Sequence, residues 1–252
     1  MRKALLVGIN LYGGPNQLQG CVNDIMSAHR LLNEQYSWLP TDTINVITDA
    51  QATTANILTG LKWLVSNVKA GDQILFWYSG HGSQLIDGNS ATDCICPVDF
   101  RFTANTSIGA QQFHDIFSTL PPGVLANWVS DSCHSGALEG DTSKGFKHIP
   151  KCIINPDIGA NKQSYFNVKS FKNVELEIGY IAGCGSSETS CDAYIGGAHC
   201  GALSYYLINN IKNMGEQSID AITEQTRQDL ISNNYSQTPC CSGNRTNLPF
   251  LG

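Results

Sequence analysis

Two apolar strands in this sequence each run into a turn that carries a reactive side chain. The first is residues 76–82, Phe-Trp-Tyr-Ser-Gly-His-Gly, and the second is residues 128–136, Trp-Val-Ser-Asp-Ser-Cys-His-Ser-Gly. The carboxyl ends of parallel strands form the reaction crevice of open α/β sheets, so His81 and Cys133 are predicted to converge at one sheet edge. Glycines on both sides of His81 let the backbone turn tightly and let a substrate approach.

The rest of the chain has the alternation that such a sheet requires. Short runs rich in Val, Ile and aromatic residues alternate with stretches of helical period, which is typical of parallel strands with crossover helices. Strands are predicted at 4–9, 43–48, 73–78, 126–130 and 179–182. Helices are predicted near 22–36, 57–68, 111–120, 201–214 and 218–232, the second capped by Thr53 or Thr54.

Composition excludes several classes of protein. The 252 residues carry a formal net charge of −6, which argues against a nucleic-acid binder that works by a basic surface. With 42% hydrophobic and 14% charged residues, the chain is predicted to fold rather than to stay disordered. It contains no apolar stretch of the roughly 20 residues that a membrane span needs.

The ten cysteines contain no Cys-x-x-Cys pair, so the usual zinc-ribbon and thioredoxin spacings are absent. The apolar run after Met1 ends at Gly8, too early for a signal peptide. These observations favour free thiols and a cytoplasmic location.

A cysteine near a histidine points to acyl transfer. The thiol is mostly protonated at neutral pH, and an imidazole within reach would remove its proton and return it to the leaving amine. The backbone N–H groups of Gly82 and Cys133 are predicted to form the oxyanion hole. Taken singly, such a Cys or His is more often a packing residue. The matching strand ends favour function, and His134 is too close along the chain to serve Cys133 as its base.

The strings at 79–82 and 131–136 resemble those of caspase-like cysteine peptidases, specifically metacaspases and their bacterial relatives. The separation of 133 − 81 = 52 residues is similar to the caspase spacing of about 50. Residues 3–10, 18–24 and 93–99 resemble the rest of the large, p20-like region, and residues 182–193 and 201–204 resemble the small, p10-like region. The Gln-Ala-Cys signature of animal caspases is missing.

The resemblance implies a caspase-like three-layer α/β sandwich, with a mostly parallel central sheet flanked by helices. The whole chain, 1–252, is then one domain: a p20-like region at 1–138, a linker at 139–173 and a p10-like region at 174–252. Family members of this type are expected to act on protein or peptide substrates as monomers, with neither nucleic acid nor membrane as a partner.

The resemblance also implies cleavage after Arg or Lys. Carried over residue by residue, the substrate pocket would contain Cys21, Asp24, Ser79 and Asp131. Two carboxylates in one cleft would pair with a guanidinium or ammonium group and repel an acidic side chain. Considered alone, each acid also has a purely structural interpretation. Asp24 would be an acid favoured by the dipole at a helix N-terminus, and Asp131 would be a carboxylate that caps a turn.

Many metacaspases bind Ca²⁺ through acidic residues after the His, and Asp87 and Asp93 lie in the matching stretch. Here Cys94 replaces an expected second acid, and a thiol is a poor Ca²⁺ ligand, so no cofactor is expected to be required. Lys144, Lys147, Lys151 and Lys162 lie in the linker, which is expected to be exposed. Autoprocessing is predicted near Lys144 or Lys147, although these lysines could simply be solvated.

Three alternatives stay open. One is a catalytically idle interaction domain with the caspase fold. A second is a legumain- or gingipain-type peptidase with a different specificity. A third is a metal-binding module built from Cys94, Cys96, Cys240 and Cys241, whose spacing is poor for zinc.

Overall fold

A computed structural model describes residues 1–38, 43–87, 90–133, 149–155, 177–184 and 188–251. Its centre is a six-stranded sheet in the order β12-β9-β7-β3-β1-β2. Five strands run parallel: β1 (Arg2–Gly8), β2 (Ile44–Thr48), β3 (Gln73–Ser79), β7 (Leu125–Asp131) and β9 (Glu177–Ala182). The edge strand β12 (Cys240–Gly243) pairs antiparallel with β9.

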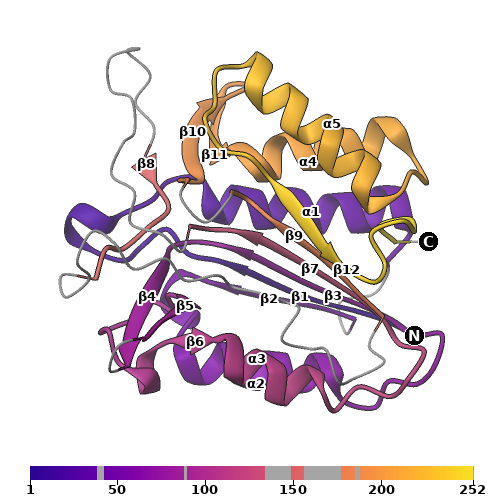
Figure 1. The fold of residues 1–252 in the computed structure, drawn as a ribbon, viewed down its shortest axis with the longest axis horizontal. Coiled ribbons are helices and arrows are strands. Elements are labelled where there is room, and N and C mark those ends of the chain that lie inside the picture. The colour runs from indigo at the N-terminus through magenta and orange to yellow at the C-terminus, as the bar shows by residue number, and fades with distance from the viewer. Residues whose placement is uncertain (39–42, 88–89, 134–148, 156–176, 185–187, 252) are drawn as a thin grey trace.

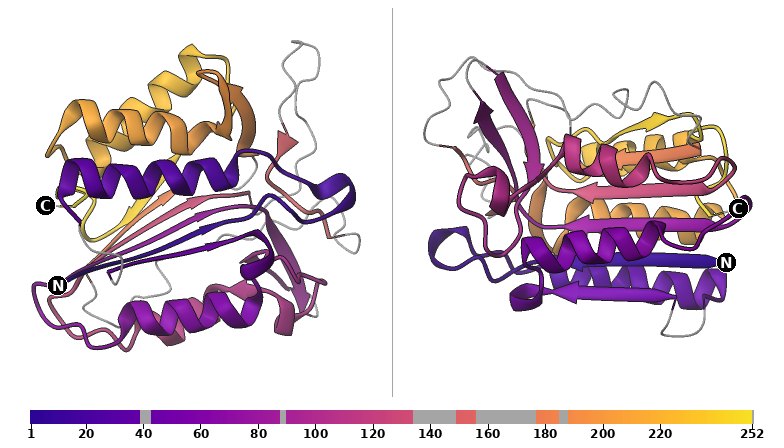
Figure 2. Two further views of the ribbon diagram at one scale, coloured as in Figure 1. Left: turned by 180° about the vertical axis from the view of Figure 1, so that it is seen from behind. Right: turned by 90° about the horizontal axis from the view of Figure 1, so that it is seen from below.

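Helices cover both faces of this sheet, which gives three layers (Figures 1 and 2). One layer holds α1 (Cys21–Tyr36), α4 (Ala202–Met214) and α5 (Ile219–Ser232), and the opposite layer holds α2 (Thr54–Val65) and α3 (Ala110–Phe117). The fold is therefore the predicted α/β sandwich, with strand and helix bounds close to those expected. The second predicted helix ends at Val65 rather than Val68, and Thr53 caps it by accepting a hydrogen bond from Asn56 N.

Two small sheets lie beside the carboxyl ends of the central strands and were not expected from the sequence (Figure 1). One contains β4 (Gly82–Asp87), β5 (Ser90–Ile95) and β6 (Ile108–Gly109). The other contains β8 (Ile149–Pro150), β10 (Cys191–Ile195) and β11 (Ala198–Gly201). Short 3-10 helices occupy Gly14–Asn16, Asp49–Gln51 and Ala104–Thr106.

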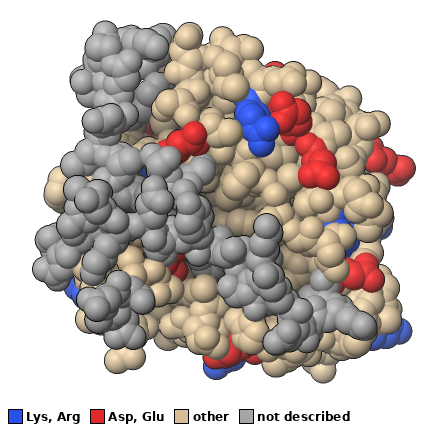
Figure 3. Space-filling model, in the orientation of Figure 1, with Lys and Arg blue, Asp and Glu red and all other residues tan. Residues whose placement is uncertain are grey.

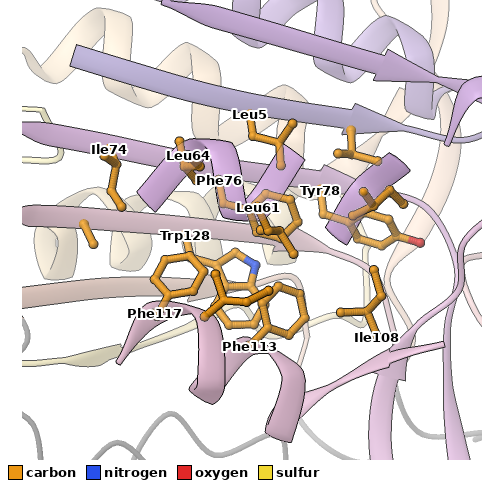
Figure 4. Packing of buried hydrophobic residues seen from close by; sticks show 14 of the residues in the cluster. Leu5, Leu61, Leu64, Ile74, Phe76, Tyr78, Ile108, Phe113, Phe117 and Trp128 are labelled. Atoms are coloured by element: carbon orange, nitrogen blue, oxygen red, sulfur yellow. The ribbon is translucent and has the colours of Figure 1, made fainter. Parts of the chain in front are cut away.

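The central sheet is buried on both faces, as a parallel sheet with helices on each side must be. Beneath β3 and β7, aromatic rings from α3 pack against Trp128, and the ring centroids of Phe113 and Trp128 are 4.2 Å apart (Figure 4). On the other face, Leu6, Trp77 and Val129 pack against α1 and α4. This packing fixes the positions of the strand ends on which the candidate site is built.

No helix in the described part of the chain is both long and apolar enough to cross a membrane. On the face shown in Figure 3, the Lys and Arg side chains of the described residues are scattered among Asp and Glu and form no continuous basic patch.

Candidate active site

The parallel register of β3 and β7 brings the two reactive turns together. Ser79 at the end of β3 is paired with Asp131 at the end of β7, and Gly80 N donates a hydrogen bond to Asp131 O at 3.3 Å. His81 and Cys133 each follow their paired residue by two positions. The two turns therefore begin side by side at one edge of the sheet.

His81 is buried against the 3-10 helix Gly14–Asn16. Its Nε2 lies 2.6 Å from the carbonyl oxygen of Asn16. Because a carbonyl only accepts, neutral His81 must carry its proton on Nε2, which leaves Nδ1 with a free lone pair. Nδ1 is buried and has no hydrogen-bond partner among the described residues. The imidazole therefore has the tautomer that a base acting through Nδ1 requires.

Burial lowers the pKa of His81 to about 4, and the nearby backbone of Asn16 and Lys151 only partly opposes this shift. Desolvation disfavours the charged imidazolium, so His81 is neutral at physiological pH. Its ring also packs on Tyr12, with ring centroids 4.5 Å apart.

Cys133 is buried and hydrogen-bonded to Ser190, the residue just before β10. The Cys133 thiol donates to Ser190 O at 3.4 Å, and Ser190 N donates back to Cys133 Sγ. Burial raises the pKa of Cys133 well above its usual range, and the neighbouring thiols of Cys184 and Cys152 act in the same direction. The thiol is therefore protonated in this state and needs a base to become a nucleophile.

Lys151 enters the site from the segment that the sequence predicted to be exposed. The prediction is wrong for this residue, because the Lys151 side chain has no exposed surface. Its carbonyl oxygen accepts hydrogen bonds from Gly82 N at 3.0 Å and from Cys133 N at 3.1 Å. Those are the two N–H groups predicted to form the oxyanion hole.

The ammonium group of Lys151 ends among acidic and hydroxyl side chains, a cluster that we call the Lys151 pocket (Asp24, Ser79, Asp131). Nζ lies 3.0 Å from Asp131 Oδ2, 3.2 Å from Asp24 Oδ2 and 2.8 Å from Ser79 Oγ. A lysine is almost never fully buried unless it is paired, and here these partners provide the pairing. The structure thus brings Asp24, Ser79 and Asp131 together around one cation.

The charges in the Lys151 pocket influence one another strongly. Burial raises the pKa of Asp24 to about 6, although the Lys151 ammonium and the hydrogen bond from Ser79 act against this rise. For Lys151, burial alone would lower the pKa, but attraction to Asp131 and Asp24 outweighs it and the pKa lies well above the ordinary value. The lysine therefore stays charged inside the protein.

Several residues that hold the two carboxylates in place have no predicted role in the sequence analysis. Ser204 donates to Asp131 Oδ2 through Oγ at 2.8 Å, and Ser190 Oγ donates to Asp131 Oδ1 at 2.6 Å. Gly201 N donates to both oxygens of Asp24, at 2.8 and 3.0 Å. Asp192 does not touch either carboxylate but holds the turn just before α1, because it accepts from the backbone N–H groups of Gln19 and Gly20. Ser190, Asp192, Gly201 and Ser204 all lie within residues 182–204. The resemblance of this stretch to the p10-like region was the only feature of the sequence that could have indicated a role for them.

Cys21 also adjoins the Lys151 pocket: it is buried at the start of α1, and its thiol interacts with Ser79 and with the charges of Lys151 and Asp24. Burial raises the pKa of this thiol, and the Lys151 ammonium opposes the rise.

The predicted metal ligand Asp93 lies apart from the pocket, in the small sheet of β4, β5 and β6. Asp93 on β5 accepts from Gln84 Nε2 at 2.9 Å. The side chain of Asp87 and all of Lys144, Lys147, Lys162 and His134 lie outside the described residues.

The described residues contain no group of three or more His, Cys, Asp or Glu side chains arranged to hold a metal ion. Cys94 and Cys96 are buried together beside Phe100, whereas Cys240 and Cys241 lie on β12 in the central sheet. The four do not form the single metal module considered as an alternative. Asp93, already bonded to Gln84, does not by itself supply the six to eight oxygen ligands that Ca²⁺ prefers.

The site contains a buried thiol, a neutral imidazole and two backbone N–H groups that donate to the same carbonyl oxygen. These are the components of a cysteine peptidase site. Comparison with known proteins agrees with this class. Residues 2–139 match the family model described as "Metacaspase, peptidase C14 domain". The chain belongs to this metacaspase family.

Curated relatives extend the similarity over nearly the whole chain. Metacaspase-1 of Coccidioides immitis is 30% identical over an alignment that covers 99% of this chain and 63% of the relative. Metacaspase-1A of Aspergillus terreus is 30% identical over 94% of this chain and 69% of the relative. The chain therefore spans about two thirds of the length of these proteins.

A solved structure shares the fold. The crystal structure of protein GSU0716 from Geobacter sulfurreducens has a TM-score of 0.71, with 20% sequence identity, and covers 98% of this chain and 96% of that chain.

Proposed function

We propose that this chain is a cysteine endopeptidase that cleaves peptide bonds after Lys or Arg. The observation that carries the proposal is the position of Lys151, whose ammonium pairs with Asp131 and Asp24 while its carbonyl accepts from Gly82 N and Cys133 N. A substrate residue before a cleaved bond would need the same two sets of contacts. The Lys151 pocket then serves as the specificity pocket, and an acidic side chain would be repelled from it.

In this mechanism His81 Nδ1 removes the proton from the Cys133 thiol, and the thiolate attacks the substrate carbonyl carbon. The developing oxyanion is stabilised by Gly82 N–H and Cys133 N–H, each such donor being worth about 3 kcal/mol. His81 then gives its proton to the leaving amine, and a thioester to Cys133 forms. Water hydrolyses this thioester, with His81 again as the base.

We also propose that the chain cleaves itself between Lys151 and Cys152. The expected sites near Lys144 and Lys147 lie outside the described residues and stay predictions. Until that bond is cut, Lys151 excludes other substrates from the Lys151 pocket, because its own ammonium already pairs with Asp131 and Asp24.

The experiment is a panel of fluorogenic peptides that differ only in having Arg, Lys, Asn or Asp before the cleaved bond, together with intact-mass mapping of the protein. Hydrolysis after Arg and Lys, absent in Cys133→Ala, is the expected result. Preferred hydrolysis after Asn or Asp would favour the legumain-type alternative. If the protein neither hydrolyses a peptide nor cleaves itself under any condition, the alternative of a catalytically idle interaction domain is favoured.

We propose further that the protein acts in the cytoplasm as a monomer and needs no metal cofactor. The compartment is supported by ten cysteines without a disulfide, and the metal proposal by the hydrogen bond that Asp93 already accepts from Gln84. Repeating the peptide panel with a Ca²⁺ chelator and with added Ca²⁺ tests the latter. Activity that requires added Ca²⁺ would overturn it.

A further inference from the structure

The residues after Lys151 are bound to the protein independently of the Lys151–Cys152 bond. Ile153 N donates to Gly82 O at 2.9 Å, and Ser83 Oγ donates to Ile153 O at 2.6 Å. Asn155 Nδ2 donates to Gln84 O at 2.9 Å. Residues 152–155 therefore run along β4 and would stay in place when the bond before them is cut.

A leaving group that stays in place favours the reverse reaction. An amine held against the acyl carbon has an effective concentration far above that of a free peptide, because it has already lost its translational freedom. The Lys151 thioester on Cys133 would then be captured again more readily than it would be hydrolysed.

The residue that would become the new amino terminus is a cysteine, which has a second nucleophile beside its amine. The Cys152 thiol is close enough to Cys133 to act on the pKa of its thiol, and it lines the same cavity of about 510 Å³ as His81. Burial raises the pKa of Cys152 to about 12, so its thiol also needs a base. His81, neutral and facing that cavity, is the base available.

We propose that the Lys151 thioester is captured by an amino-terminal cysteine, either Cys152 itself or that of another peptide, so that the protein joins peptides as well as cutting them. This inference rests on the proposed peptidase function and extends it to a ligase activity with a defined class of acceptor.

The steps balance without any oxidant or further reactant. His81 takes the Cys152 thiol proton, and the thiolate attacks the Lys151 carbonyl carbon. The bond from that carbon to Cys133 Sγ breaks, and Cys133 regains a proton from His81. The Cys152 amine then attacks the same carbon through a five-membered ring, the new C–S bond breaks, and the liberated thiolate takes the proton that the amine loses. The products are the original amide and two free thiols.

The test separates the two proposals by using a small donor and a small acceptor. The donor is Ile-Pro-Lys-aminomethylcoumarin, the sequence of residues 149–151, and its release of coumarin measures thioester formation. The acceptors are the peptides Cys-Ile-Ile-Asn, the sequence of residues 152–155, and Ser-Ile-Ile-Asn as the matched control. Mass spectrometry then measures the ligated heptapeptide against the hydrolysed tripeptide.

We expect the Cys acceptor to give at least about tenfold more ligated product than the Ser acceptor, because a thiolate attacks the thioester much faster than a hydroxyl does and then passes the acyl group to its own amine. Coumarin release with hydrolysis alone, or with equal ligation to both acceptors, would overturn the ligase proposal and leave the peptidase intact. Absence of coumarin release by protein that has been cut after Lys151 would exclude both the peptidase and the ligase.

A second measurement uses the internal acceptor. In Cys152→Ser the recapturing thiol is lost, so fragment 1–151 with a free carboxylate should accumulate several-fold faster than in the wild type. An unchanged or slower rate in a folded Cys152→Ser protein would contradict recapture by Cys152.

Discussion

The ammonium group of Lys151 lies 3.0 Å from the carboxylate of Asp131, and neither side chain has any exposed surface. Such a pair is expensive to desolvate, and removing one partner of a buried pair typically costs about 3–5 kcal/mol. A stabilising role alone would be served better by apolar residues. The pair is explained when the pocket is built for a cation and the chain's own lysine occupies it.

Substitution of Lys151 tests whether that lysine defines the internal cleavage site. Lys151→Arg keeps a cation that both carboxylates can bind, so cleavage before Cys152 should persist. Lys151→Gln removes the charge and should abolish it. Intact-mass analysis after incubation measures both, and Lys144→Gln and Lys147→Gln are the matched controls, expected to behave as the wild type. Persistent cleavage before Cys152 in Lys151→Gln would contradict the assignment.

Neutralising the carboxylates should weaken the recognition of basic substrates. A hydrogen bond to a charged group contributes about 1.5–3 kcal/mol, so Asp131→Asn and Asp24→Asn should each lower kcat/KM for Lys and Arg peptides about 10- to 100-fold. Unchanged kcat/KM in both folded variants would exclude the Lys151 pocket as the specificity pocket.

Gly201 tests the shape of the same pocket. A methyl group at this position would meet Asp131 Oδ2, Lys151 Nζ and Asp24 Oδ2 at distances that real Cβ atoms do not show. Gly201→Ala should therefore block the pocket and abolish hydrolysis after Lys and Arg. Gly109→Ala is the matched control, because its nearest contact would be Asp93 O at 3.3 Å. Equal activity in the two variants would show that basic side chains bind elsewhere.

The pKa of His81 gives stability a predictable pH dependence. Its pKa falls from 6.5 to about 4 on folding, so below pH 6.5 the unfolded chain takes up a proton that the folded chain does not. This contribution destabilises the fold progressively as the pH falls from about 6.5 towards 4, by about 2 kcal/mol at pH 5. Asp24 acts with the opposite sign, because its raised pKa, about 6, lets the folded state bind a proton first as the pH falls.

Urea unfolding at pH 7 and pH 5 measures this effect, in a Cys133→Ala background so that no cleavage interferes. The same measurement on Cys133→Ala with His81→Gln isolates the histidine, because glutamine does not titrate while Asp24 is unchanged. The loss of stability between pH 7 and pH 5 should be smaller in the His81→Gln protein. Equal losses would mean that His81 is not held neutral by burial.

Much of the fold was predictable because its signals are local. Apolar strands such as residues 73–78 and the helical period of residues 57–68 determine the element types, and a right-handed α/β alternation leaves few ways to arrange them. The small sheets around β4 and β10 were missed because their strands are short and their sequences, such as Cys191–Ile195, have no clear alternation.

The sequence by itself determined that His81 and Cys133 follow neighbouring strands, and the motif order identified the family, because strand ends and motifs are properties of consecutive residues. Only the tertiary structure decided where Lys151 goes. Its burial depends on Asp24, Ser79 and Asp131, which are 127, 72 and 20 positions away along the chain. No local pattern distinguishes a lysine held by distant carboxylates from one in water, because the difference is the solvation of its charge.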